Sequence, residues 1–199
     1  MKIASVLAMS ALALAASGNA NAVSIDFEAT ATGTYSSLTI GAATITYTGG
    51  NGKFDVVDSG SPGAPISKNS LISYFANPGA APFKVAIAGG ASTFKVGVGD
   101  YDADEDHAHL RAYSAANVLL ASADYINPLP TYGGDYMSVS SASPIAYVTF
   151  WEDGAFPGAV YWDNISYDAA AAVPEPETYA LMGLGLAALG LVSRRRRRV

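Results

Sequence analysis

Short runs of β-branched and aromatic residues fill the region between residues 23 and 172, and Gly, Pro, Asn and Asp separate them. No stretch of this region shows a sustained apolar period of about 3.6 residues, so helices are not expected there. Turn signals recur at a spacing typical of sandwiches, at 49–52, 61–63, 77–79 and 89–90. The spacing therefore predicts an all-β domain.

The predicted architecture is a two-sheet antiparallel β-sandwich with a jelly-roll-like topology. The strands expected are 24–28, 35–40, 43–47, 54–57, 71–75, 83–87, 93–98, 109–113, 118–123, 136–139, 145–151 and 160–167. Pairing of the first strand with the last would bring Asp26 and Glu28 near Asp163. Alternation in 145–151 predicts that Ala146, Val148 and Phe150 face the core, and that Tyr147, Thr149 and Trp151 face away from it.

The charge of this region narrows the choice of partners. Residues 23–173 contain five basic and fifteen acidic residues, a formal charge of −10. Such a surface repels phosphate backbones, which argues against nucleic-acid binding, and it favours divalent cations or neutral ligands. The chain has no cysteine, so disulfides and thiol chemistry are excluded.

The N-terminal segment has the pattern of a signal peptide. Lys2 precedes an apolar stretch that ends at Ala16, and Ala20, Asn21 and Ala22 form a small-x-small site. The apolar stretch is shorter than the roughly 20 residues that a membrane span needs. We therefore expect a helical signal peptide over 1–22, which signal peptidase cuts after Ala22.

The C-terminal segment combines three unlike elements within 173–199. Prolines lie at 174 and 176, an apolar stretch covers 178–192, and five arginines follow at 194–198. The prolines favour an extended, accessible segment, and the apolar stretch predicts a short membrane helix. Arginines behind such a helix stay on the cytoplasmic side, so the domain over 23–172 is expected outside the cytoplasm.

This tail resembles the PEP-CTERM sorting signal of Gram-negative bacteria, which is also catalogued as an ice-binding protein C-terminal domain. The resemblance implies recognition by exosortase, a membrane cysteine peptidase, with cleavage near Pro174, Glu175 and Pro176. It also implies export linked to exopolysaccharide and biofilm matrix. The expected location is the inner membrane during export, and then the periplasm, the cell surface or the medium.

A cluster of acids predicts a calcium site. Asp100, Asp102, Asp104 and Asp106 place hard oxygen ligands in one loop, which suits calcium. The loop is not an EF-hand, because Glu105 and Arg111 occupy positions that require glycine and glutamate. The alternative is a solvated acidic loop between two strands.

Two other metal sites are conceivable. Glu28 and Asp163 could hold calcium where the first and last strands meet, because 161–165 resembles the closing strand of jelly-roll carbohydrate-binding modules. Asp163 could instead hydrogen-bond a neighbouring turn. His107 and His109 would share a strand face and could bind zinc with Asp104 or Asp106.

Aromatic residues could form a platform for sugar rings. The candidates are Trp151, Trp162, Tyr101 and Tyr132, with Tyr125 and Tyr136 as further members, and the alternative is that they fill the core.

Catalytic signatures are missing: the sequence has neither a Gly-x-Ser-x-Gly elbow nor a His-Glu-x-x-His motif. Glu28, Glu105 and Glu152 are the only glutamates of the mature region.

The sequence thus predicts an exported, exosortase-processed envelope or matrix protein without enzymatic activity. Its β-sandwich would bind a glycan or a matrix polymer, and calcium is the candidate cofactor. The alternatives are a secreted glycan hydrolase or lyase and a purely structural, calcium-stabilised surface protein.

Overall fold

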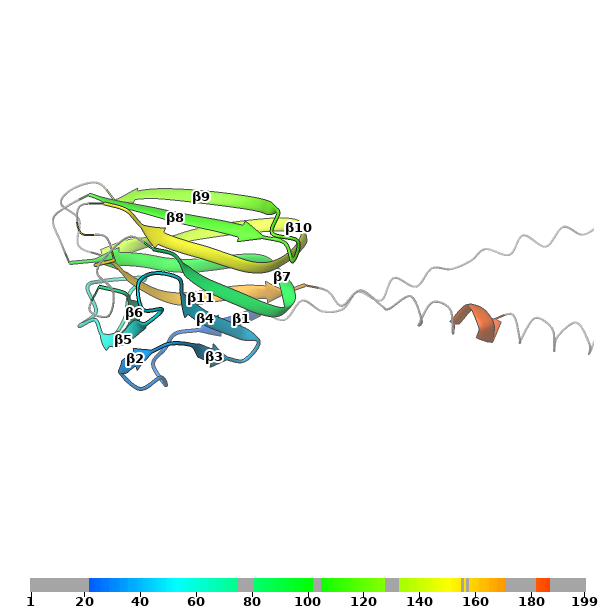
Figure 1. Ribbon diagram of the computed structural model, residues 1–199, viewed down its shortest axis with the longest axis horizontal. Coiled ribbons are helices and arrows are strands. Elements are labelled where there is room, and N and C mark those ends of the chain that lie inside the picture. Colours follow the sequence, from blue (N-terminus) through cyan, green and yellow to red (C-terminus); the bar gives the residue numbers. More distant parts are fainter. Residues whose placement is uncertain are drawn as a thin grey trace, which may run out of the picture.

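The structure is a computed structural model that describes residues 22–74, 81–101, 105–127, 133–154, 156, 158–170 and 182–186. The described part forms eleven strands: β1 Ala22–Ile25, β2 Gly33–Tyr35, β3 Leu38–Ile40, β4 Ala43–Tyr47, β5 Phe54–Asp58, β6 Asn69–Ile72, β7 Phe83–Asp100, β8 Asp106–Tyr113, β9 Leu119–Asn127, β10 Gly133–Glu152 and β11 Tyr161–Ala169. Their pairings are antiparallel (Figure 1). The prediction of an all-β, antiparallel domain is confirmed.

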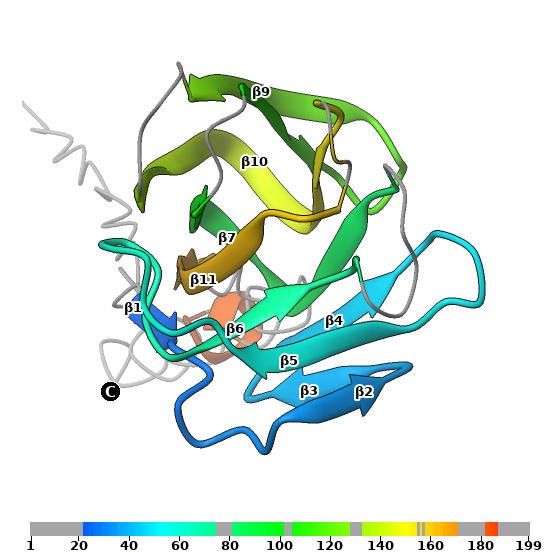
Figure 2. The ribbon, with the colours of Figure 1, turned by 90° about the vertical axis from the view of Figure 1, so that its left-hand side faces the viewer.

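The strands form one continuous sheet rather than the two separate sheets predicted. The first part of β7 pairs with β4 and with the second part of β10, whereas its second part pairs with β11 and the first part of β10. The sheet therefore folds into two layers that share β7 and β10. The first layer has the order β3-β4-β7-β10-β8-β9, and the second has β10-β7-β11-β6-β5-β2, with β1 also on β11 (Figure 2).

Glycine explains how β7 continues from one layer into the other. Gly89 and Gly90 have φ angles of 81° and 77°, which L side chains rarely adopt. A Cβ atom at Gly90 would also lie 3.1 Å from Cβ of Pro144 in β10, where the strand register shifts. The prediction of a turn at 89–90 was therefore wrong. These glycines bend a strand without ending it, and four predicted strands merge into two.

Aromatic rings fill the space between the layers. Phe150 of the first layer packs against Phe83 with a centroid distance of 5.4 Å, against Trp162 of β11 at 4.7 Å and against Phe94 at 6.5 Å. All four side chains are at most 1% exposed. Burial of rings of this size, about 150–250 Å² each, is the main stabilising contribution to such a core.

The predicted alternation of 145–151 is confirmed for Val148 and Phe150, which are buried. It is wrong for Ala146, which is half-buried, because Ile145 takes the core position instead. The register shift between Ile145 and Tyr147 accounts for the difference.

The first and last strands pair, as the sequence predicts, with Ala22 opposite Asp168 and Ile25 opposite Ile165. The described domain therefore begins and ends on neighbouring strands at one end, on the right of Figure 1. The end of β7 and the start of β8, where Asp100 and Asp106 of the acidic cluster lie, are at the opposite end.

A helix covers residues 182–186, inside the apolar stretch predicted to span the membrane. Most of the predicted signal peptide, the prolines at 174 and 176 and the rest of the predicted membrane helix lie outside the described residues. Among the residues described, no helix has the length and apolar character needed to cross a membrane.

Candidate functional site

The outward side of β8 carries the densest set of functional side chains. His107, His109, Arg111 and Tyr113 alternate with the buried Ala108, Leu110 and Ala112. The strand register places Trp151 and Tyr147 of β10 opposite His109 and Tyr113, and Asp124 of β9 opposite His109 on the other side. We call this surface the Trp151 face; its members are His109, Arg111, Tyr113, Asp124, Tyr147, Trp151 and Asp153.

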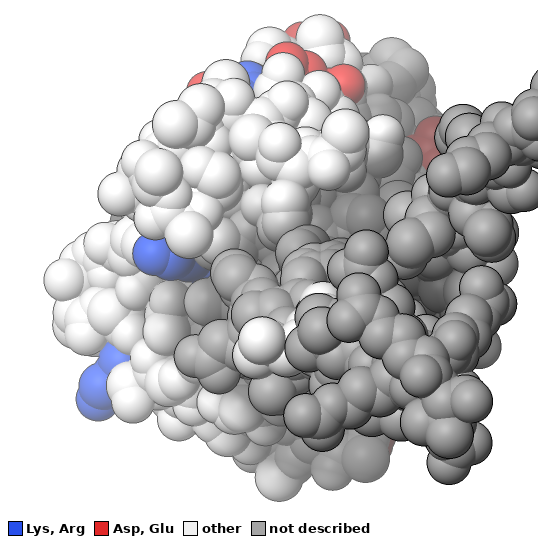
Figure 3. Space-filling model, turned by 90° about the vertical axis from the view of Figure 1, so that its right-hand side faces the viewer, with Lys and Arg blue, Asp and Glu red and all other residues white. Residues whose placement is uncertain are grey.

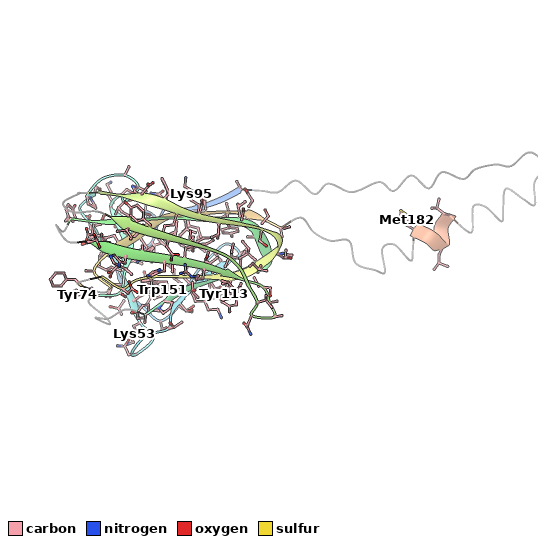
Figure 4. The ribbon with its side chains drawn as sticks, turned by 90° about the horizontal axis from the view of Figure 1, so that it is seen from above. Lys53, Tyr74, Lys95, Tyr113, Trp151 and Met182 are labelled. Atoms are coloured by element: carbon pink, nitrogen blue, oxygen red, sulfur yellow. The ribbon has the colours of Figure 1, made fainter. Side chains whose placement is uncertain are left out.

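Trp151, which the sequence predicted to face away from the core, lies at the centre of this face with its side chain half-buried. Its ring lies 4.9 Å from the His109 ring, with an interplanar angle of 30°, and 5.5 Å from Cζ of Arg111. Figure 4 places Trp151 and Tyr113 on the same side of the domain, opposite Lys95. An indole fixed in this way keeps its orientation before any ligand arrives.

Charged groups surround Trp151. Oδ1 of Asp124 lies 2.6 Å from Nδ1 of His109 and 2.7 Å from Nη2 of Arg111. The hydrogen bond with His109, followed by that with Arg111, lowers the pKa of Asp124, so this carboxylate stays ionised at neutral pH. Nε2 of His109 lies 3.2 Å from Oδ2 of Asp153 but is not aligned for a hydrogen bond.

A second aromatic pair extends the Trp151 face toward the end that carries the paired Ala22 and Asp168. The rings of Tyr113 and Tyr147 stack at 4.9 Å with an interplanar angle of 13°. Nζ of Lys84 lies 4.1 Å from the centroid of Tyr147, and the Tyr147 hydroxyl donates a hydrogen bond to Oδ1 of Asn117 over 3.1 Å. The face therefore combines flat apolar rings with fixed donors and acceptors.

Trp162 and Tyr101, two other predicted platform residues, do not join this face. Trp162 is only 1% exposed and packs on Phe150, so the prediction that it contacts a ligand was wrong: alternation in β11 turns it toward the core. Tyr101 is 39% exposed and contacts Tyr161 edge-on, at the β7–β8 connection. Tyr132 lies outside the described residues.

The second group of interest is centred on Asp163, which is fully buried. Its Oδ2 accepts hydrogen bonds from the amide and the hydroxyl of Ser67, both over 2.9 Å. The Ser67 hydroxyl also lies 3.1 Å from Oε1 of Glu28. The prediction that Glu28 approaches Asp163 is therefore confirmed. Burial raises the pKa of Asp163 to about 6 despite these hydrogen bonds.

The hydrogen bonds that neighbouring groups donate to Asp163 do not fit a calcium site. Oδ1 accepts from the Asn164 amide over 2.6 Å, and Oδ2 accepts from the Asn164 side chain over 3.3 Å in addition to Ser67. A cation would have to displace these groups, because calcium needs the same lone pairs. Within the described ranges, no group of three or more acidic or histidine side chains could hold a metal ion. The structure instead matches the alternative prediction, in which Asp163 forms hydrogen bonds with a neighbouring turn.

The acidic loop is only partly described. Asp100 and Asp106, which begin and end it, are each 4% exposed, so they are not the solvated carboxylates of the alternative interpretation. Asp102 and Asp104 lie outside the described residues, and calcium in this loop stays a prediction.

The two histidines lie on the same face of β8, as predicted, but they do not share a site among the described residues. Nε2 of His107 lies 2.6 Å from Oε1 of Glu105, whereas His109 contacts Asp124. Asp106 is buried and therefore points to the other side of β8. The strand alternation thus contradicts a zinc site that combines Asp106 with both histidines.

Sequence reasoning missed Asp124, Arg111 and Ser67 as members of these groups. The alternation of His107, His109, Arg111 and Tyr113 was a readable signal of one polar strand face. Nothing local marks Asp124 or Ser67, because their partners come from other strands. Of the predicted processing residues, Ala22 is exposed and begins β1, whereas Pro174, Glu175 and Pro176 lie outside the described residues.

Several solved structures resemble the domain; the three described next have TM-scores below 0.5. A DUF4465 family protein from Bacteroides caccae matches with a TM-score of 0.48 and 11% identity over 75% of this chain and 100% of its own. The K3 cleaved adhesin domain of Lys-gingipain from Porphyromonas gingivalis matches with a TM-score of 0.46 and 15% identity. This match covers 74% of this chain and 98% of the adhesin domain. The family 11 carbohydrate-binding module of a Clostridium thermocellum cellulase matches with a TM-score of 0.29 and 12% identity. This match covers 76% of this chain and 95% of the module.

No curated protein shows significant similarity to the chain. The family model of the PEP-CTERM protein-sorting motif matches residues 172–198. This match covers the C-terminal tail with its prolines, apolar stretch and arginines, and it implies exosortase as a processing partner and export to the cell envelope or surface. The chain is therefore a PEP-CTERM sorting domain-containing protein.

Proposed function

We propose that the folded domain is a non-catalytic module that binds a glycan of the extracellular matrix through the Trp151 face. One observation carries the proposal: aromatic rings and fixed charged groups lie side by side on the outer surface of β8, β9 and β10. The link to exopolysaccharide and biofilm, and a jelly-roll identity for the two-layered fold, belong to the same proposal.

The chemistry of the Trp151 face suits a sugar. The apolar face of a pyranose ring stacks on an indole, while its hydroxyl groups need donors and acceptors at the rim. Asp124 and Asp153 have side chains that are 56% and 48% exposed, and they can accept hydrogen bonds from hydroxyl groups. His109 and Arg111 hold Asp124 in place, so little ordering remains to be done when a ligand binds.

The position of the Trp151 face also supports a role outside the membrane. Trp151 lies on the side of the domain, on the outward face of the first layer (Figure 4), whereas the paired Ala22 and Asp168 lie at one end of it. Figure 3 shows the end at which the domain begins and ends, and few Asp and Glu atoms are visible on its uncovered part. A ligand would therefore reach Trp151 from the side of the domain, without passing the end that carries Ala22 and Asp168.

Two carboxyl groups argue against the alternative of a glycan hydrolase. A general acid needs a raised pKa, whereas the pKa of Asp124 is lowered. Glu152 is buried, and its carboxylate accepts hydrogen bonds from the amides of Gly154 and Gly158. It therefore fixes the connection after β10 and is not presented to a ligand.

The test is binding of the purified full chain to an array of bacterial exopolysaccharides, followed by calorimetry on each positive glycan. Trp151→Ala should weaken binding at least tenfold, as loss of a buried aromatic anchor usually does. Phe156→Ala, at a residue that is 56% exposed and outside the face, should leave binding unchanged. Equal binding by Trp151→Ala would refute the site, and release of sugar by the unmodified protein would favour the hydrolase.

A further inference from the structure

A hollow lies on the outer side of the second layer, among residues of β1, β7, β10 and β11. Its volume is about 380 Å³, which falls within the range of about 300–1,000 Å³ that is typical of ligand sites. Figure 4 places Lys95, one of its residues, on the side of the domain opposite Trp151. We call it the Lys95 hollow; its polar members are Thr93, Lys95, Ser138, Ser140, Ser166 and Asp168.

Lys95 supplies the positive charge of the hollow, and an aromatic ring holds it in place. Ser138 of β10 and Ser166 of β11 lie opposite Lys95 on its two sides. Nζ of Lys95 lies 3.6 Å from the ring centroid of Tyr136, which is 42% exposed. Although the domain is acidic, Lys95 forms no ion pair with any carboxylate that the structure describes. A ring orients an ammonium group without neutralising it, so the N–H groups of Lys95 can still bind an anion.

A second row of side chains in the hollow supplies hydrogen-bonding groups. Ser140 of β10 and Asp168 of β11 lie opposite Thr93 of β7. The Thr93 hydroxyl donates to Oδ2 of Asp168 over 2.8 Å, which fixes this carboxylate. The side-chain hydroxyls of Ser138, Ser140 and Ser166 make no hydrogen bond within the described part of the protein. These three hydroxyls can therefore donate to a ligand or accept from it.

We propose that the Lys95 hollow binds a sugar that carries a carboxylate, as the units of an acidic polysaccharide do. The carboxylate pairs with the ammonium group of Lys95, and a charge-assisted hydrogen bond of this kind is about twice as strong as a neutral one. The hydroxyl groups of the same sugar bond to the serines and donate to Asp168. A phosphate has more negative charge and no hydroxyl groups to offer Asp168, so this carboxylate favours an acidic sugar over a phosphate.

The Lys95 hollow and the Trp151 face are separate sites. They share no residue, and they lie on opposite sides of the domain, on the outer surfaces of different layers (Figure 4). One molecule can therefore hold two polysaccharide chains at once and link them. The hollow selects chains by their charge, whereas the Trp151 face selects them by stacking.

Calorimetry on the purified full chain tests the need for a charged sugar. The probes are the tetramers of galacturonate, guluronate and mannuronate, and each is compared with its neutral methyl ester. At least one acidic tetramer should bind, and its methyl ester should bind at least tenfold more weakly. Binding of the acid should also weaken as salt is added, because ions screen the attraction to Lys95. Equal binding of acid and ester, or no binding of any acid, would overturn the proposal.

A lysine variant then locates the site. Lys95→Gln should weaken binding of the acidic tetramer about tenfold, because it removes a hydrogen bond between charged groups. Lys53→Gln removes an equal charge elsewhere on the domain, as Figure 4 shows, and should leave binding unchanged. Unchanged melting temperatures would show that both variants fold. Unchanged binding by Lys95→Gln, or equal losses in the two variants, would refute the hollow as the site.

Trp151→Ala separates this site from the proposed function of the Trp151 face. This variant should bind the acidic tetramer as the unmodified protein does, even though it loses the glycan that stacks on Trp151. Lys95→Gln should show the converse pattern. Loss of the acidic tetramer in Trp151→Ala but not in Lys95→Gln would assign the acidic sugar to the Trp151 face and overturn the second site.

Discussion

Ser67 and Asp163 are 96 residues apart in the sequence, yet the amide and the hydroxyl of Ser67 both donate to Oδ2 of Asp163. This contact joins the loop before β6 to the last strand. Asn164 strengthens the same junction, because its side-chain amide donates to the carbonyl of Pro65 over 2.6 Å. The connection between β5 and β6 is thus fixed to the second layer by buried hydrogen bonds.

Replacement of Ser67 by alanine should lower the free energy of unfolding by about 1–3 kcal/mol, because a buried carboxylate loses one of its donors. Urea denaturation followed by tryptophan fluorescence measures the change. Ser140→Ala, at an exposed position, should change the value by less than about 0.5 kcal/mol. Equal stabilities of the two variants would contradict a structural role for the Ser67 hydroxyl.

Asp163 should make stability depend on pH. Its pKa of about 6 in the folded state exceeds the ordinary value of 3.8 because of burial, so the folded state binds a proton more tightly than the unfolded chain does. The contribution is fully present below about pH 4 and is lost as the pH rises through 6, with a size of at most about 3 kcal/mol. The difference in unfolding free energy between the natural protein and Asp163→Asn should therefore grow in favour of the natural protein from pH 7 to pH 4. A difference that stays constant from pH 7 to pH 4 would disprove the raised pKa of Asp163 in the folded state.

Truncation of Trp162 should be among the most destabilising changes. Trp162→Ala leaves a cavity against Phe150 in the centre of the core, and such changes cost about 3–5 kcal/mol. Trp151→Ala, on the outer face, should cost clearly less. Thermal unfolding followed by circular dichroism distinguishes the two, and the opposite order would mean that the roles of the tryptophans are reversed.

Calcium in the loop between Asp100 and Asp106 would raise the melting temperature of the full chain, because an ion that binds only the folded state stabilises it. Removal of calcium with a chelator should then lower the melting temperature by several degrees. The combined change of Asp102→Asn and Asp104→Asn should abolish the effect of the chelator, whereas Asp58→Asn should preserve it. A melting temperature that does not respond to calcium or chelator would remove the metal from this loop.

Local patterns were sufficient for several features of the protein. The spacing of β-branched residues and turn signals gave most strand positions, and alternation placed Val148 and Trp151 on opposite sides of β10. The pairing of β1 with β11 was also predicted. Local patterns failed at 89–90, where two glycines that signal a turn instead bend a continuous strand, because only packing against β10 and β11 keeps that strand going.

The sequence by itself determined the all-β class, the acidic character of the domain and the sorting motif at its C-terminal end, because composition, spacing and the order of local motifs carry this information. The tertiary structure alone decided which residues act together. Asp124 joins His109 and Arg111, and Ser67 joins Asp163, only because strands distant in the sequence become neighbours in the sheet. The two tryptophans illustrate the reason: Trp151 and Trp162 look alike in the sequence, but strand register puts one on the surface and the other in the core.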